Sequence, residues 1–223
     1  MSPSGDASRP RQFESQTWAV RPADNDSVEM QFRLVLRGAL PPNKQGKANA
    51  KHRIRQELHP QLRVLWQQHP ALAIKCRARP EAGETRPPVE DYADAYARCG
   101  FRFVPLVDLD TACALDILLL RRDQPNQLFF AGDIDGRVKT LLDGLRLPQQ
   151  CSEVSGLSPT HDEDPFFVLM EDDRSIYEIN VTTDRLLVPP EPNEPERDVV
   201  AVINVRTRSA SGGSLLNIHD NYR

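Results

Sequence analysis

The chain has 223 residues, of which 39% are hydrophobic and 27% charged, and this composition predicts one soluble globular domain rather than a disordered or fibrous protein. Its net charge of −4 excludes a protein that coats nucleic acid over its whole surface, although a local basic surface remains compatible with it. No apolar run is long enough to span a bilayer, and residues 1–10 lack the apolar core of a signal peptide, so we expect a cytoplasmic protein with no membrane partner.

The first predicted elements are a strand and a long helix. Residues 1–26 show no sustained hydrophobic period, which predicts a flexible N-terminal arm before a single domain over residues 27–205. Apolar and polar residues alternate from Val28 to Leu36, as in a half-buried strand. From about Lys47 to Gln68 apolar residues recur every three or four positions, which predicts a helix that Pro60 should kink or divide.

The middle of the chain predicts an insertion and then two strands. Residues 77–100 are polar and contain prolines, and a short helix is expected within them over 92–98. Strands are expected over 101–107 and 113–121. The second is an almost continuous apolar run, which favours a central position in a sheet.

A second helix and further strands follow. An apolar stripe predicts a helix from about Asp135 to Leu147, and the polar residues 149–164 predict an inserted loop. The remaining strands are expected over 166–170, 176–181 and 199–205, before a mobile tail over 206–223. Together these elements predict an α+β fold, in which about two main helices pack on a mixed β-sheet.

The start of the second helix carries a candidate metal site. Asp133 and Asp135 stand two positions apart just before and at the start of that helix, and Mg²⁺ binds carboxylates together with waters and substrate phosphates. Lys139 and Asp143 follow Asp135 at successive steps of four residues, so we expect these three side chains to share one helix face. The alternative is that one aspartate caps the helix and Lys139 forms an ordinary surface ion pair.

Two other charged segments contain candidate functional residues. Asp172 and Asp173 follow a predicted strand and can supply further carboxylates, or can form a solvated β-turn. A basic segment without acidic residues is a candidate nucleic-acid surface, or else a solvated helix face. Its candidate contact residues are Lys44, Lys47, Lys51, Arg53 and Arg55.

The four cysteines predict free thiols. Cys76, Cys99, Cys113 and Cys151 are widely spaced and form no Cys-x-x-Cys pair. This spacing indicates neither a zinc ribbon nor a dense disulfide framework.

Three segments together resemble the RusA family of Holliday-junction resolvases. They are the Leu40-Pro41-Pro42-Asn43 loop after the first strand, the segment from Asp133 through Lys139 to Asp143-Gly144-Leu145, and Asp172-Asp173-Arg174-Ser175-Ile176. The resemblance implies a RusA-like fold and a nuclease, usually a homodimer, that uses Mg²⁺, with Mn²⁺ as an alternative, to cut branched DNA in recombination and repair. It implies that Asp133, Asp135 and Asp173 bind the metal, with Asp172 as the adjacent candidate, and that Lys139 is the catalytic cation.

The chain also departs from the family pattern. Gly136 stands where the family has an asparagine, and the chain is longer than the compact resolvases. A second hypothesis is therefore a catalytically altered module on the same fold that binds nucleic acid or a partner without cutting. A third is a structural protein of a larger assembly, which the insertions and proline-rich loops favour.

Overall fold

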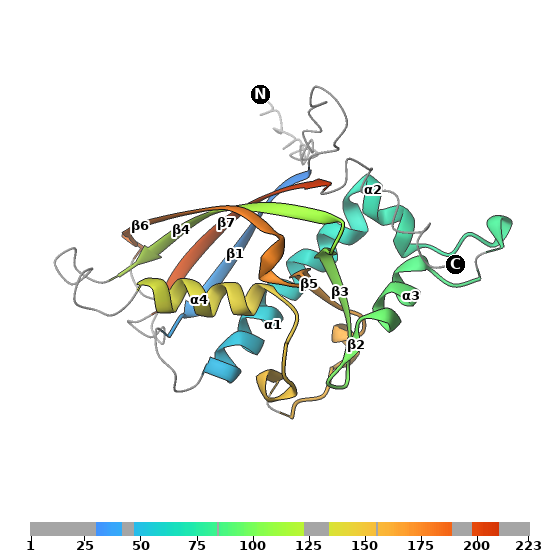
Figure 1. The fold of residues 1–223 in the computed structure, drawn as a ribbon, viewed down its shortest axis with the longest axis horizontal. Coiled ribbons are helices and arrows are strands. Elements are labelled where there is room, and N and C mark those ends of the chain that lie inside the picture. Colours follow the sequence, from blue (N-terminus) through green and yellow to red (C-terminus); the bar gives the residue numbers. More distant parts are fainter. Residues whose placement is uncertain are drawn as a thin grey trace, which may run out of the picture.

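The computed structural model describes residues 30–41, 47–83, 85–122, 134–154, 156–188 and 198–209. Within these residues the predicted α+β class is confirmed, because helices pack with β-sheets that contain both parallel and antiparallel strand pairs (Figure 1). The predicted arm over 1–26 lies outside the described residues. None of the described helices is long and apolar enough to cross a membrane.

The larger sheet has four strands in the order β1-β7-β4-β6. These strands are β1 Met30–Ala39, β4 Thr111–Arg121, β6 Ile176–Arg185 and β7 Asp198–Ser209. β7 is antiparallel to both β1 and β4, whereas β6 is parallel to β4. The predicted central position of the apolar strand β4 is therefore confirmed. β7 extends to residue 209, so the first four residues of the predicted tail belong to this strand.

A second sheet of three strands has the order β2-β3-β5. Its strands are β2 Ala97–Arg98, β3 Phe101–Val107 and β5 Phe166–Met170. β3 is antiparallel to β2 and parallel to β5. The predicted mixed sheet is thus divided into two, because the chain passes from β3 in one sheet to β4 in the other through the turn at 108–110.

Two long helices accompany several short ones. The long helices are α1 Lys47–Gln68 and α4 Ile134–Leu145, and the short α-helices are α2 Pro70–Ala73 and α3 Pro88–Ala95. Single turns of 3-10 helix occupy Ile74–Cys76 (η1), Pro80–Ala82 (η2), Cys151–Val154 (η4), His161–Glu163 (η5) and Asp173–Ser175 (η6). Both regions predicted as insertions thus contain helical turns.

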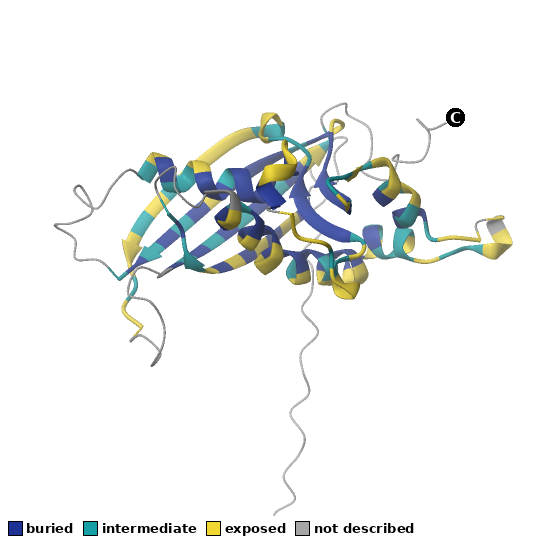
Figure 2. Ribbon diagram, turned by 90° about the horizontal axis from the view of Figure 1, so that it is seen from below, coloured by how far each residue is buried: buried dark blue, intermediate teal, exposed yellow. Residues whose placement is uncertain are grey.

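α1 and α4 lie on the same face of the larger sheet, as Figures 1 and 2 show. The face of β1 toward them is apolar and buried, while the alternate residues 31, 33, 35 and 37 are exposed on the opposite face. α1 buries Ile54, Leu58 and Leu62 and continues through Pro60 without a break. Pro60 is exposed, so its ring and missing N–H affect the solvent side of the helix while the buried stripe holds it together.

The two long helices approach each other closely at Gly144. A Cβ atom at this position would lie 2.7 Å from the Cβ and Cγ2 atoms of Ile54 on α1. Only glycine allows this separation, so Gly144 sets the distance between α4 and α1.

The prediction that all four cysteines are free thiols is wrong for two of them. Cys99 and Cys151 form a disulfide, contrary to the prediction of free thiols, whereas Cys76 and Cys113 are free. The pair is 52 residues apart in sequence, so no local motif indicated it. The fold brings the turn between β2 and β3, which holds Cys99 at a φ of 54°, next to η4.

Candidate functional site

The structure brings two of the three family-like segments together. Arg137 on α4 donates a hydrogen bond from Nη1 to the carbonyl oxygen of Leu40 at 2.7 Å. Thr140 Oγ1 lies 3.1 Å from the carbonyl oxygen of Pro41 and 2.8 Å from that of Gly136 in its own helix, so its single proton is shared between the two. These bonds fix the segment that follows β1 against the first turns of α4. Pro42 and Asn43 lie outside the described residues.

A second cation holds the same segment from α1. Arg53 donates a hydrogen bond to the carbonyl oxygen of Ala39. The neighbouring Gly38 has a φ of 123°, and a Cβ atom there would lie 3.3 Å from the Arg53 guanidinium. Glycine at position 38 therefore allows both the left-handed backbone and the close approach of Arg53.

Asp135 and Lys139 occupy the exposed side of α4. They are one helical turn apart, in the positions from which side chains share a face. Asp133 lies outside the described residues. Asp135 is in the first turn of the helix, where the backbone N–H groups and the helix dipole favour anions.

Asp143, the third residue of the predicted face, does not share this exposure. It is 8% exposed and accepts a hydrogen bond from Arg146 Nη2 at 2.7 Å, while Lys51 Nζ lies 3.0 Å from its other carboxylate oxygen. Burial opposes ionisation of Asp143, but these hydrogen bonds outweigh it and lower the pKa of the carboxyl group. The prediction of a common face for all three residues is therefore wrong. Two steps of four residues turn an α-helix by about 80°, which brings Asp143 to the buried side of α4.

Much of the predicted basic surface also has an internal role. Arg55 is 1% exposed and donates to Glu153 Oε2 at 2.7 Å, to the carbonyl oxygen of Arg146 at 2.8 Å and to that of Asp143 at 2.8 Å. With Lys51 it forms a buried α1–α4 ion cluster, which comprises Lys51, Arg55, Asp143, Arg146 and Glu153.

The predicted DNA contact of Lys51 and Arg55 is therefore replaced by a structural role, since a phosphate could reach Arg55 only by breaking this cluster. Arg53 remains exposed at the surface. Lys44 and the side chain of Lys47 lie outside the described residues.

Asp172 and Asp173 lie in the connection between β5 and β6. Asp172 caps η6: its side chain accepts from the backbone N–H of Arg174 at 3.0 Å and from Arg174 Nε at 2.9 Å. These hydrogen bonds lower the pKa of Asp172. Asp173 is exposed. The turn that the sequence left as an alternative is thus observed for this pair.

This connection is far from the start of α4. Ser175 Oγ donates to the carbonyl oxygen of Asp108, and Ile176 pairs with Cys113 at the beginning of β4. Leu40 instead follows the end of β1, which is level with the other end of β4: Gly38 and Arg121 both pair with Val199 of the intervening strand β7. These two ends of β4 are about 26 Å apart at ~3.3 Å per residue.

Asp135 and the Asp172–Asp173 pair therefore lie at opposite ends of the sheet (Figure 1). The part of the chain that the structure describes contains no group of three metal-ligating side chains. The predicted ligand set is not assembled within these residues, and its remaining carboxylate, Asp133, lies outside them.

The sequence did not indicate a tyrosine and carboxylate network beside Asp172. The Tyr92 hydroxyl donates to Asp108 Oδ2 at 3.1 Å, and the Tyr96 hydroxyl donates to Glu171 Oε2 at 3.1 Å. Burial raises the pKa of both phenols, and burial lowers the pKa of Lys75 to about 8, although nearby Asp108 opposes that change. The four-residue spacing of the tyrosines on a helical segment was the available signal, but their partners are distant in sequence.

Comparisons of the chain with models of protein families, with curated proteins and with solved structures find no match.

Proposed function

We propose that this protein is a metal-dependent endodeoxyribonuclease that hydrolyses phosphodiester bonds in branched DNA, as a homodimer. Its centre is the start of α4, where Asp133 and Asp135 hold Mg²⁺ and Lys139 contacts the reacting phosphate. Mg²⁺ is commonly bound by one or two protein carboxylates together with waters and substrate phosphates, so two aspartates suffice.

The observation that carries the proposal is the clamp at the start of α4. Arg137 and Thr140 hold the segment after β1 against the helix, and Asp135 and Lys139 are left exposed one turn apart. A metal here can activate a water and neutralise charge on the phosphodiester. Lys139 can stabilise the charge that develops in the transition state.

Cations near the clamp favour a polyanionic substrate. Arg37 and Arg53 are exposed at the end of β1 and the start of α1, and Lys139 is exposed on α4. Contacts of Lys and Arg with phosphates supply most of the sequence-independent affinity for DNA. In this proposal Arg53 and Lys139 contact DNA, while Asp172 and Asp173 of the same chain are too remote to bind the metal.

The alternative function is a module that binds branched DNA without cutting it. Gly136 favours this alternative, because it removes the family's asparagine amide from the first turn of the helix and lowers helix propensity there. Both functions require affinity for branched DNA, but only the nuclease cleaves the DNA that it binds.

The test is a cleavage assay on four-way, forked and linear DNA with Mg²⁺, Mn²⁺ or a chelator. We expect metal-dependent nicking of the branched substrates, lowered by about 100-fold or more in Asp135→Asn and Lys139→Ala. Asp116→Asn, an exposed aspartate on the opposite sheet face, is the matched control and should keep wild-type activity.

Three outcomes separate the possibilities. Binding of junctions without cleavage by any variant would select the non-cutting module. Cleavage that Asp173→Asn abolishes, but Asp135→Asn does not, would move the centre to the other end of the sheet. Absence of both binding and cleavage would refute a role on DNA.

A further inference from the structure

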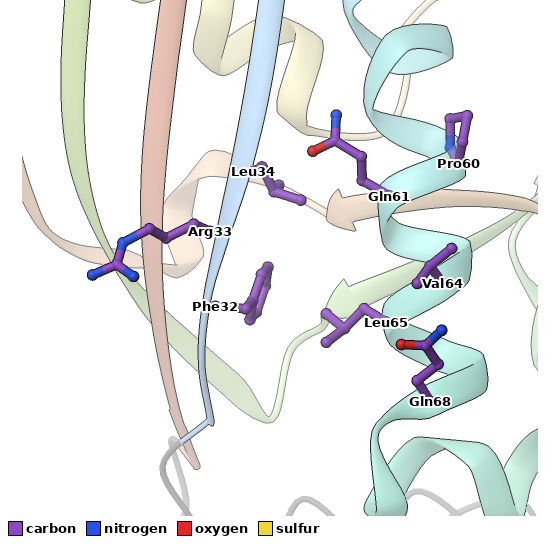
Figure 3. Close-up of a pocket in the computed structure, with 8 residues that line it drawn as sticks. All are labelled: Phe32, Arg33, Leu34, Pro60, Gln61, Val64, Leu65 and Gln68. Atoms are coloured by element: carbon purple, nitrogen blue, oxygen red, sulfur yellow. The ribbon is translucent and has the colours of Figure 1, made fainter. Parts of the chain in front are cut away.

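A groove lies between helix α1 and the outer edge of β1, the terminal strand of the larger sheet among the described residues. It has a volume of about 370 Å³, and Phe32, Leu34 and Leu65 lie on its apolar side. Pro60 and Val64 line it from α1, as Figure 3 shows. This groove lies outside the clamp at the start of α4 and has no part in the proposed cleavage.

The helix already mimics a neighbouring strand at one point of this edge. The side-chain amide of Gln61 accepts a hydrogen bond from the backbone N–H of Val35 at 2.9 Å and donates to the carbonyl oxygen of Val35 at 2.7 Å. A primary amide offers one acceptor and two donors, so it satisfies the strand edge as a peptide group of a paired strand would. The Val35 backbone therefore faces away from β7.

The next outward-facing backbone positions offer the same groups, and in the described part of the chain no side chain takes the place that Gln61 takes at Val35. In a strand every second residue directs its N–H and carbonyl to the same side, so Arg33 and Gln31 present theirs beside Val35. Among the described residues, no hydrogen bond reaches the backbone of Arg33 from this side. Figure 3 shows the Arg33 side chain directed away from the groove, which leaves the backbone accessible.

The residues on the two faces of β1 indicate which side chains an added strand would need. On the groove side, Val64 is an exposed aliphatic residue at 45% exposure above the buried Phe32 and Leu65. On the opposite face, Arg33 and Arg37 are exposed at alternate positions of the strand. An added strand would place alternate side chains against the apolar wall and the others beside the arginines, where opposite charges stabilise cross-strand pairs.

We propose that the β1–α1 groove binds an extended peptide of a partner protein, in which apolar and acidic residues alternate, as an added strand against Gln31–Arg33. The backbone hydrogen bonds provide affinity, while the apolar wall and the arginines select the side chains. Gln61 occupies the edge at Val35, so the added strand is short. This interruption also disfavours continuous pairing of β1 with β1 of a second copy.

The test measures binding of a fluorescently labelled peptide of alternating Glu and Val to the full chain by anisotropy. We expect saturable binding, weakened about tenfold or more when Lys replaces Glu or when Ser replaces Val in the peptide. Val64→Asp should weaken it to a similar degree, because the charge would lie against the apolar side of the peptide. Gln67→Asp is the matched control, exposed on the same helix but outside the groove.

Two variants at one position separate the backbone from the charge. Arg33→Pro removes the edge N–H without removing a bond to β7, and proline is tolerated at such edge positions. It should weaken binding more than Arg33→Ala, which removes only the charge. Circular dichroism of each variant verifies that it is folded.

Several results would overturn the proposal. These are absence of saturable binding, equal effects of Val64→Asp and Gln67→Asp, or equal binding of the Glu- and Lys-containing peptides. Light scattering that shows a dimer which Val64→Asp dissociates would assign the groove to a second copy instead.

Discussion

Replacement of Arg55 by methionine tests whether this arginine stabilises the fold or contacts DNA. Its side chain is fully buried in the α1–α4 ion cluster and donates to Glu153 and to the carbonyl oxygens of Asp143 and Arg146. Removal of one partner from a buried ion pair costs about 3–5 kcal/mol. Lys51, 3.5 Å from Glu153, still compensates part of the remaining charge, so we expect a loss near 3 kcal/mol.

Urea denaturation of Arg55→Met, followed by circular dichroism, measures this loss. Affinity for a labelled four-way junction is measured in parallel, under conditions in which the variant is folded. We expect lower stability with unchanged affinity. Arg53→Met, at an exposed position two residues earlier, should show lower affinity and a smaller loss of stability, about 0.5–1.5 kcal/mol, because it removes only the hydrogen bond to the carbonyl oxygen of Ala39. An Arg55→Met protein with wild-type stability and weakened DNA binding would refute the structural role.

Three further predictions concern packing, cross-linking and pH. Gly144→Ala should lower the free energy of unfolding by about 1–3 kcal/mol, because the new methyl group overlaps Ile54; unchanged stability in urea would contradict the close approach. Cys99→Ser should lower the free energy of unfolding by about 2–4 kcal/mol under oxidising conditions, because it removes the cross-link to Cys151. Dithiothreitol should then have no further effect on the stability of this variant. The pKa of Asp143 is lower in the folded protein than in the unfolded chain, so ionised Asp143 adds to the free energy of unfolding. This contribution is complete above the unfolded pKa of about 4 and is lost as pH falls through the folded pKa. Acid titration should therefore destabilise the wild-type protein more steeply than Asp143→Asn.

The sequence predicted the longer elements well because hydrophobic periodicity is a local signal. The short helix expected over 92–98 is instead α3 at Pro88–Ala95, followed by β2 at Ala97–Arg98. The helix over 47–68 and the strands over 101–107 and 166–170 were predicted with the bounds that the structure has. The expected break at Pro60 did not occur, because its missing hydrogen bond lies on the solvent side of a helix held by buried leucines. Local pattern fixed each element but did not indicate that the strands form two sheets.

The side-chain partners were less predictable because they are distant in the chain. Lys51 and Arg55 had the spacing of a basic helix face, and only the fold shows that Glu153, about a hundred residues later, lies against them. Likewise, Cys99 and Cys151 meet only after η4 packs beside the turn between β2 and β3. Charge and cysteine patterns identify candidate residues, whereas the tertiary contacts decide their roles.

The family-like segment on α4 contains two residues that the fold explains and two that it does not. Asp143 and Gly144 are explained by the fold: one joins the buried ion cluster, and the other permits the contact with Ile54. Because the fold accounts for both residues, they add nothing to the case for cleavage. Asp135 and Lys139 are exposed, and no packing requirement accounts for them. The proposed nuclease activity depends on this exposed pair and on Asp133. Substitution of Asp135 or Lys139 should therefore change the chemistry, with a change in stability of about 1 kcal/mol at most from the lost interaction of Asp135 with the helix dipole.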